Sequence, residues 1–461
     1  MSQSWINLAY LVAAVCLIVG IRELSHPRTA RRGNLVAAFG MAIAILFTLF
    51  DRDIDEFWLM AAGIGIGTVV GVASARRVRM TAMPQMVALF NGVGGGAAAL
   101  IAAAEFHNHA PEADRLAGDQ IGGILFSALV GSVSFWGSLV AFGKLQELVP
   151  GRPIVFPAQN AINAVLGAAL VALIALTATT EDGTWLALLF PGALILGVLF
   201  VLPIGGADMP IVISLLNAST GLAAASTGFV LNNTALIIGG TLVGASGTLL
   251  TILMGRAMGR PLKLTLFGAF GAAPAEAAAA ATGDGQVRTA GADDIAVMLA
   301  YARRVVFVPG YGLAVAQAQH DVRSLAGLLE ERGVDVRYAI HPVAGRMPGH
   351  MNVLLAEANV PYDELFEMEQ INPEFPQTDV VVVVGANDVV NPAARNSPGS
   401  PIYGMPILDV DRARNVVVIK RSLSPGFAGV DNPLFYDPKT VMLFDDAKAA
   451  LERLVVAVKS V

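Results

Sequence analysis

The sequence predicts a multi-span α-helical membrane domain followed by an α/β doubly wound, Rossmann-like domain. Three observations support this fold class. The 461 residues are 55% hydrophobic and only 14% charged, whereas soluble proteins have about 25% charged residues. The long apolar runs end by Met258, and most charged residues follow Arg288. After Arg288, apolar β-branched runs alternate with helical patterns, which is typical of a parallel sheet covered by helices.

Nine segments before position 260 are long and apolar enough to cross a bilayer, which takes about 20 residues. We expect these spans near 5–21, 34–50, 57–74, 84–104, 121–142, 161–178, 185–202, 210–230 and 235–255. Basic residues gather in alternate connections: Arg22, Arg28, Arg31 and Arg32; Arg76, Arg77 and Arg79; Lys144 and Arg152; Arg256, Arg260 and Lys263. The positive-inside rule then predicts an outside N-terminus and a cytoplasmic C-terminal domain.

The composition sets the domain boundaries and excludes several classes of site. We assign 1–260 to the membrane domain, 261–290 to a flexible linker rich in Ala and Gly, and 291–461 to the second domain. The first apolar run lacks a basic leader and a cleavage signature, so we expect a retained span. The single Cys16 excludes a disulfide framework and a thiolate metal site within this chain. A net charge of −6 argues against a nucleic-acid partner.

Small and polar residues within the spans have two interpretations. Glycines cluster at 63–67, 92–96 and 239–247, which indicates close helix packing and is also compatible with a water-filled path. Four polar side chains lie deep in the spans: Asn91, Ser138, Asn163 and Asn217. Each needs a partner in apolar surroundings, so each is either an interhelical hydrogen bond or part of a proton path.

The second domain contains a glycine motif in the position expected of a dinucleotide fingerprint. We predict strands at 303–308, 334–340, 379–385 and 415–420, and helices at 312–332, 349–358 and 445–459. Gly310 and Gly312 follow the first strand and open a helix, where backbone can approach a pyrophosphate. Val315 replaces the usual third glycine, so either the helix packs differently or the nucleotide lies differently. A glycine turn without a ligand is the alternative.

The residues after the second strand favour NADP over NAD. An NAD site needs an acidic side chain about 20 residues beyond the glycines, to bind the ribose 2′-hydroxyl. This strand ends instead at Ile340, His341 and Pro342. A 2′-phosphate would be repelled by a carboxylate and attracted by Lys420 and Arg421, at the end of a later strand. The alternative for these two cations is a solvated strand end.

Three further loops place glycines and prolines at the carboxyl ends of strands, where open α/β sheets bind ligands. They are 341–350, 385–388 and 424–432. We expect Arg346 to pair with a pyrophosphate and Asp388 to hydrogen-bond a nicotinamide or ribose. The segment from Gly426 to Asn432 is expected to fold over the cofactor as a lid.

Several strings carry a resemblance that covers essentially the whole chain. They are 205–210 (GGADMP), 310–312 (GYG) with 314–319 (AVAQAQ), 341–346 (HPVAGR), 385–388 (GAND) with 391–394 (NPAA), and 420–422 (KRS). With these strings and its nine expected spans, the chain resembles the beta subunit of proton-translocating NAD(P) transhydrogenase.

The resemblance implies a Re/Si-specific hydride transfer from NADH to NADP+ that is coupled to inward proton movement. It implies that this chain binds NADP(H), and that NAD(H) binds to a separate alpha subunit of one or two chains. It also implies a dimer of alpha–beta units in the lipid bilayer of the cell inner membrane. Direct transfer between two nicotinamides needs no catalytic nucleophile, acid, base or metal on this chain.

The resemblance also implies the cofactor-binding residues. They are Gly310, Tyr311, Gly312, Ala314, Val315, Gly345, Arg346, Met347, Gly385, Ala386, Asn387, Asp388, Lys420, Arg421, Ser422, Gly426, Phe427, Ala428, Asp431 and Asn432. Some relatives have tyrosine at the position of Phe427. The missing hydroxyl removes one hydrogen bond, so we expect this lid to hold NADP(H) less tightly.

For the proton path, the resemblance implies Asn91, Ser138 and Asn217, and we add Asp208 as a coupling residue because of its place in the chain. Relatives have histidine or asparagine at the position of Asn91, and asparagine does not carry a proton at ordinary pH. We assign His107 and His109 to an outside loop, so a titrating histidine is expected from the partner's spans. Asp208 is expected at the cytoplasmic end of the eighth span, and its alternative role is a carboxylate at a helix N-terminus.

Two other classes of function combine many spans with a Rossmann-like domain. A transporter or channel gated by a cytoplasmic nucleotide-sensing domain would need a selectivity filter or a charged translocation site, and the sequence displays neither. An NADP-binding membrane scaffold would bind the nucleotide without turnover, even when an alpha subunit is supplied.

Overall fold

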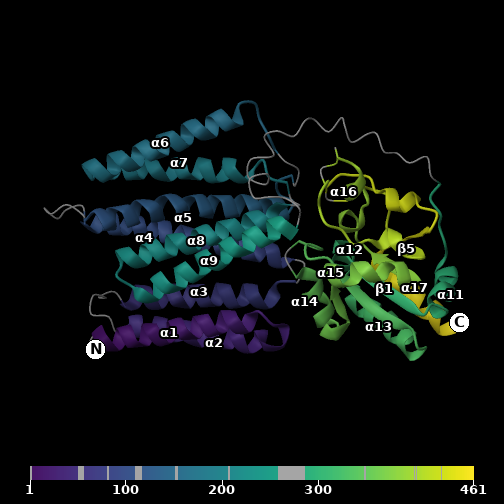
Figure 1. Ribbon diagram of the computed structural model, residues 1–461. Coiled ribbons are helices and arrows are strands. Elements are labelled where there is room, and N and C mark those ends of the chain that lie inside the picture. Colours follow the sequence, from purple (N-terminus) through teal and green to yellow (C-terminus); the bar gives the residue numbers. More distant parts are fainter. Residues whose placement is uncertain are drawn as a thin grey trace. The chain divides into compact units, whose positions relative to one another are not determined.

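The computed structural model describes two compact units. The described residues are 3–49, 57–79, 82–109, 117–150, 154–205, 208–257, 286–346, 349–398, 400, 402–426 and 428–461. One unit comprises Met1–Gly205 with Ile211–Thr251, and the other comprises Gly206–Pro210 with Ile252–Val461. Most of the expected linker, 261–290, lies outside the described residues. Each unit is described by itself below (Figure 1).

The described part of the chain contains nine helices long and apolar enough to cross a membrane, as predicted. They are α1 (Gln3–Leu24), α2 (Pro27–Thr48), α3 (Phe57–Arg77), α4 (Met83–His109), α5 (Gly118–Leu145), α6 (Gln159–Thr180), α7 (Gly183–Val201), α8 (Met209–Val230) and α9 (Thr234–Ala257). The chain is therefore a multi-pass membrane protein.

The largest differences from the expected span ends are at the start of α2 and the end of α4. Helix α2 begins at Pro27, because proline suits the first helical position, so Arg28 and its basic neighbours lie in the first turns of α2. Helix α4 continues to His109, and Phe106 in its last turns is buried. The assignment of His107 and His109 to a loop was therefore wrong. His107 lies within the candidate span Met83–Asn108, so a described span of this chain contains a histidine.

The glycine clusters of the spans pack in different ways. A Cβ on Gly131 of α5 would lie 2.5 Å from the carbonyl oxygen of Gly95 in α4, so these two helices touch through their backbones. By contrast, a Cβ on Gly63, Gly65 or Gly67 of α3 would meet no atom within 4 Å among the described residues. The expected close packing is therefore found at the 92–96 cluster and is not found at 63–67.

The second unit is a six-stranded parallel sheet in the order β3-β2-β1-β4-β5-β6, which confirms the doubly wound prediction. The strands are β1 (Arg304–Pro309), β2 (Asp335–Ile340), β3 (Leu365–Glu367), β4 (Val380–Val384), β5 (Asn415–Lys420) and β6 (Thr440–Phe444). Strands β3 and β6 were not predicted. The first has only three residues, and the second is a five-residue apolar run between two turns.

Side chains alternate between the two faces of this sheet. Val305 and Phe307 of β1 pack with helices α11 (Ala292–Ala300), α13 (Gln319–Glu331) and α17 (Ala447–Ser460). The intervening side chains of β1 pack with α15 (Met368–Ile371) and nearby short helical turns. Both faces are covered, which explains why the strands are almost uniformly apolar.

The helix that follows β1 is divided in two. It was predicted as one helix over 312–332, but α12 (Tyr311–Ala316) ends at Gln317, whose φ of 52° is left-handed. The chain then restarts as α13 at Gln319. The break lets Ala318 turn into the core, where it is fully buried.

Candidate functional site

The candidate nucleotide site lies at the carboxyl ends of β1 and β4. These neighbouring strands form the point where the strand order reverses, and open α/β sheets bind ligands in the crevice there. The loops after them are joined by main-chain hydrogen bonds. The Gly310 nitrogen donates to the Val384 oxygen at 2.9 Å, and the Gly312 nitrogen donates to the Gly385 oxygen at 2.9 Å.

The glycines of these two loops allow the backbones to touch. A Cβ on Gly310 would lie 2.4 Å from the Cα of Ala386, and Gly385, with a φ of +63°, packs against Gly312 equally closely. No larger side chain fits there. Val315, in place of the usual third glycine, is 46% exposed. It therefore points away from the packing between helix and sheet, and its size is accommodated without a clash.

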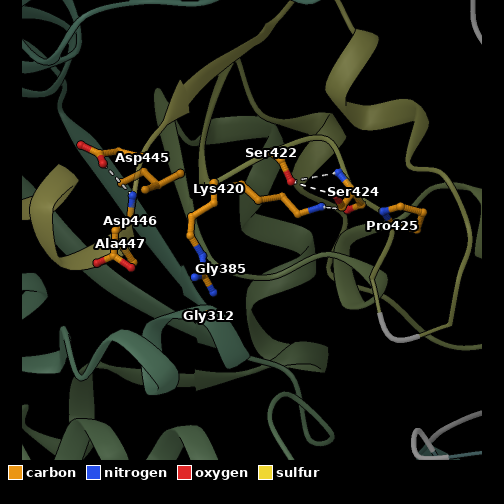
Figure 2. A pocket seen from close by; sticks show the side chains of 11 residues that line it. Gly312, Gly385, Lys420, Ser422, Ser424, Pro425, Asp445, Asp446 and Ala447 are labelled. Atoms are coloured by element: carbon orange, nitrogen blue, oxygen red, sulfur yellow. Dashed lines mark hydrogen bonds between the residues drawn. The ribbon is translucent and has the colours of Figure 1, made fainter. Parts of the chain in front are cut away.

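A cavity of about 230 Å³ opens beside these glycines. It is lined by Gly312, Gly385, Ile419, Lys420, Arg421, Ser422, Ser424, Pro425, Asp445, Asp446 and Ala447. Figure 2 shows Ser422, Ser424 and Pro425 on one side of the cavity and the Asp445–Ala447 segment on the other. The site thus combines main chain, hydroxyl groups and two cationic side chains.

The two cations differ in how they are held. Lys420 Nζ donates to the Ser424 carbonyl oxygen and lies 5.0 Å from the ring centre of Phe435. Burial lowers the pKa of Lys420, against the opposing effect of the Asp388 and Asp431 carboxylates. Arg421 is exposed and forms no ion pair with any described residue. Arg421 is therefore the cation available to a ligand.

The two acidic residues of the cavity are already engaged. Asp445 forms an ion pair with Arg453. Asp446 caps α17 by accepting a hydrogen bond from the Lys448 nitrogen at 3.0 Å. Because both carboxylates have donors of their own, they oppose an incoming phosphate less than two unpaired charges would.

The lid segment is attached to the loop after β4. The Asp388 carboxylate accepts a hydrogen bond from the Ala428 nitrogen at 2.9 Å. A Cβ on Gly426 would lie 2.3 Å from the Asp388 carboxylate and 2.7 Å from Asn387 Nδ2, so the lid approaches as closely as glycine allows. Phe427 lies outside the described residues.

Two buried asparagines complete this attachment. Asn391 donates to the Asp431 carbonyl oxygen at 3.0 Å, and Asn432 Nδ2 donates to Asn387 Oδ1 at 3.1 Å. Ala428 and Val430 of the lid also pack against a small apolar cluster. Asn387 Nδ2 is buried and has no acceptor among the residues that the structure describes. A nucleotide carbonyl or phosphate oxygen would satisfy it, so these residues fit a dinucleotide.

The loop after β2 contributes a cation and two histidines. Arg346 stacks on the ring of Tyr311, 4.4 Å from its centre. Gly345 has a φ of +102°, and a Cβ there would lie 2.4 Å from the ring of His350. The Arg346 nitrogen donates to His350 Nδ1 at 3.1 Å, so the His350 ring fixes the backbone beside Arg346. Met347, the neighbouring predicted residue, lies outside the described part of the chain.

His341 occupies the position where an NAD-binding domain has its acidic residue. Its Nδ1 accepts from the Val343 nitrogen at 3.2 Å, so Nε2 carries the proton and donates to the Pro406 oxygen at 2.8 Å. Burial lowers the pKa of His341 to about 4. The ring is therefore neutral at ordinary pH and fastens the segment at Pro406 to the sheet edge.

Replacing His341 with glutamine is expected to reduce the acid sensitivity of the fold. The folded pKa lies below the ordinary value of 6.5, so the stabilisation is complete above pH 6.5 and is lost as the pH falls toward 4. The loss amounts to about 3 kcal/mol at 1.36 kcal/mol per pKa unit. Thermal unfolding of the full chain in detergent across this pH range measures the effect. His320→Gln, at an exposed position of α13, is the matched control and should leave the pH dependence unchanged.

Two of the four residues expected in the proton path, Asn91 and Ser138, are connected by a hydrogen bond. Asn91 Nδ2 of α4 donates to Ser138 Oγ of α5 at 2.9 Å. Asn217 is half-buried in α8 and takes no part in this cluster, as far as the described residues extend. Asp208 immediately precedes α8, which begins at Met209. Asn163, the fourth polar residue noted in the spans, lies in α6.

Several residues of these sites were not predicted. Asp445, Asp446 and Ala447 line the cavity because β6 also ends at this edge of the sheet. An acidic pair after an apolar run, followed by a helical pattern, was the available signal. Ser134 and Thr220, which join the Asn91 cluster, could not be separated by sequence from the many other hydroxyl groups in the spans.

Comparison with known proteins gives consistent results along the whole chain. A family model described as NAD(P) transhydrogenase beta subunit matches residues 6–457. The NAD(P) transhydrogenase subunit beta of Rhodospirillum rubrum is 50% identical over 464 residues, which cover 99% of this chain and 100% of the relative. The corresponding subunit from one strain of the same organism has the same identity and coverage. The similarity therefore includes both the helical unit and the sheet.

Proposed function

The chain belongs to the NAD(P) transhydrogenase beta subunit family, and from this premise we propose that it binds NADP(H) and couples hydride transfer to inward proton movement. Membership implies an oxidoreductase role and an alpha-subunit partner. In the proposed reaction, NADH bound to the alpha subunit reduces NADP+ bound to this chain, with Re/Si specificity. The working unit is a dimer of alpha–beta pairs.

The observation that carries the proposal is the exposed Arg421 in a glycine-lined cavity at the switch point of a parallel sheet. A guanidinium binds a phosphate through two parallel hydrogen bonds. The sequence directly after β2, residues 341–350, contains no Asp or Glu, whereas NAD-binding domains have an acidic residue there. Arg421 would thus bind the 2′-phosphate, while Lys420 binds the Ser424 carbonyl oxygen, two residues before the lid begins. Both features favour NADP(H) over NAD(H).

The remaining residues bind and orient the nucleotide. Arg346 would neutralise the pyrophosphate, and its stacking on Tyr311 limits its motion. The lid, attached through Asp388, Asn391 and Asn432, would exclude water from the nicotinamide. Bound NADP(H) supplies the hydride acceptor or donor, so the protein has only to align two rings and control when they meet.

The proposed proton path comprises Asn91, Ser138 and Asn217 of the membrane-spanning helices, together with Asp208, which immediately precedes α8. We propose that the N-terminus lies outside the cell inner membrane and that the NADP(H) domain lies in the cytoplasm. This orientation follows from the excess of arginine and lysine in alternate connections. Inward proton movement would then favour NADP+ reduction.

Nucleotide binding and turnover test the proposal in two steps. The purified chain should bind NADPH at least about tenfold more tightly than NADH, because only NADPH has the 2′-phosphate. Addition of the alpha subunit should then produce NADPH from NADH and NADP+. Equal affinity for the two nucleotides would contradict the proposed site. NADPH binding without hydride transfer in the complete complex would instead favour a nucleotide-sensing membrane protein.

A further inference from the structure

A chain of hydrogen bonds extends the Asn91 cluster to a third helix. Asn91 Nδ2 donates to Ser138 Oγ at 2.9 Å and to Ser134 Oγ at 3.4 Å. Ser134 Oγ lies 2.5 Å from Thr220 Oγ1 and 3.0 Å from the Leu216 carbonyl oxygen. Helices α4, α5 and α8, which lie side by side (Figure 1), are therefore joined at one point through polar side chains.

Close helix contact sets this geometry. Ser134 and Ser138 are four residues apart on α5, so both face the same neighbour. The contact of Gly95 with Gly131 brings the backbones of α4 and α5 together. A Cβ added to Gly92 would lie 3.2 Å from the Cβ of Ser138, so α4 is also close to α5 at this point. The amide of Asn91 can therefore reach both serines at once.

One polar atom of Asn91 has no partner. The residue is only 8% exposed, and its Oδ1 is buried without a hydrogen-bond donor among the described residues. Rotating the amide by 180° exchanges its oxygen and nitrogen but still leaves one of them unpaired. An unpaired buried amide is costly in an apolar interior, and such groups usually bind an ordered water.

The hydroxyl groups of the cluster can change their hydrogen-bond direction. A hydroxyl donates one hydrogen and accepts others, and the Ser134 hydroxyl has two acceptors within reach, Thr220 Oγ1 and the Leu216 oxygen. Its hydrogen can therefore turn from one acceptor to the other without leaving the cluster unsatisfied.

We propose that Ser134 and Thr220 are positioning residues of the proton path, and that they orient the Asn91 amide so that its free atom binds a water molecule that carries the proton. This inference rests on the proposed function. The amide and the hydroxyls do not titrate; they hold the water between α4, α5 and α8. The proton enters and leaves this water, and no covalent bond to the protein changes.

The test compares the removal of hydroxyl groups from this cluster with the removal of a hydroxyl group elsewhere on α5. Thr220→Val keeps the shape and loses the hydroxyl, Thr220→Ser keeps the hydroxyl, and Ser134→Ala removes the other partner. Ser127→Ala is the matched control, because Ser127 is also fully buried and donates to α8, at 3.1 Å to the Ala223 oxygen. Its position on α5 is about two turns from Ser134.

Each variant is assembled with the alpha subunit in proteoliposomes, and gradient-driven NADPH formation is followed in H2O and D2O. Thr220→Val and Ser134→Ala should lower the rate of NADPH formation about tenfold, as expected when one hydrogen bond that supports proton transfer is lost. They should also raise the ratio of the rate in H2O to the rate in D2O. Thr220→Ser should restore most of the rate. Ser127→Ala should change neither the rate nor the ratio. NADPH binding by each variant verifies that its sheet unit is folded, and assembly with the alpha subunit is verified for each variant before the rates are compared.

The outcomes separate the inference from the proposed function. If the rates of Thr220→Val, Ser134→Ala and Ser127→Ala fall equally with an unchanged isotope ratio, the hydroxyls only pack the helices and the inference is overturned. It is also overturned if Thr220→Val retains the wild-type rate. If the wild-type complex forms NADPH at a rate that does not depend on the proton gradient, the proposed function is contradicted, and the inference, which rests on it, is contradicted too.

Discussion

Replacing Arg421 with alanine is expected to weaken NADPH binding about 10- to 100-fold, because a hydrogen bond to a charged group contributes about 1.5–3 kcal/mol. The reason lies in the unequal roles of the two cations. Lys420 is occupied by the Ser424 carbonyl, whereas Arg421 lines the cavity without an ion pair to any described residue. Titration calorimetry of the full chain in detergent, with NADPH and with NADH, measures the loss.

The control for Arg421→Ala removes a positive charge far from the cavity. Lys459 lies exposed in the last turn of α17, and Lys459→Ala should leave both affinities unchanged. The affinity for NADH should also be nearly the same in Arg421→Ala as in the wild type, since NADH has no 2′-phosphate. An equal loss of affinity for both nucleotides would show that Arg421 supports the fold or contacts a part common to both.

Replacing Gly310 with alanine is expected to abolish measurable NADPH binding and to lower the unfolding temperature of the chain. The added Cβ would lie 2.4 Å from both the nitrogen and the Cα of Ala386, and neither backbone atom can rotate away. Overpacking of this kind costs about 1–3 kcal/mol and sometimes more. The loops after β1 and β4 would have to separate, and that separation would remove the cavity wall formed by Gly312 and Gly385.

Gly327 provides the matched control for this substitution. It lies within α13, and a Cβ there would meet no atom within 4 Å among the described residues. Gly327→Ala should therefore bind NADPH normally and should stabilise the helix by about 0.5–1 kcal/mol. Thermal unfolding and NADPH titration of both variants measure these effects. Normal nucleotide affinity in Gly310→Ala would mean that the contact between the two loops does not shape the site.

The parts of the fold that depend on local pattern were predictable. Nine apolar runs of sufficient length predicted nine spans. The run of valines at β4 predicted a strand, and the structure buries every residue of it. The break at Gln317 was not predictable, because the helical pattern continues through it and the left-handed φ is set by packing of Ala318. His107 was misplaced because the end of α4 depends on the packing of Phe106.

The candidate site was predictable in position and less so in detail. Glycines and charged residues at strand ends had to meet at one edge of a parallel sheet, and Gly312, Gly385 and Arg421 line one cavity there. The different environments of Lys420 and Arg421 depend on where Ser424 and Phe435 fold, which no local pattern reveals. The same limit applies to Ser134, whose importance lies in a contact with another helix.

Coupling between the proton gradient and hydride transfer is the central claim, and one measurement tests it directly. The chain and its alpha subunit are reconstituted in proteoliposomes, an inward proton gradient is imposed, and NADPH formation from NADH and NADP+ is followed optically. We expect the gradient to accelerate NADPH formation and an uncoupler to abolish the acceleration. NADPH formation at the same rate with and without the gradient would contradict the proposed coupling, because the membrane unit would then have no part in the reaction.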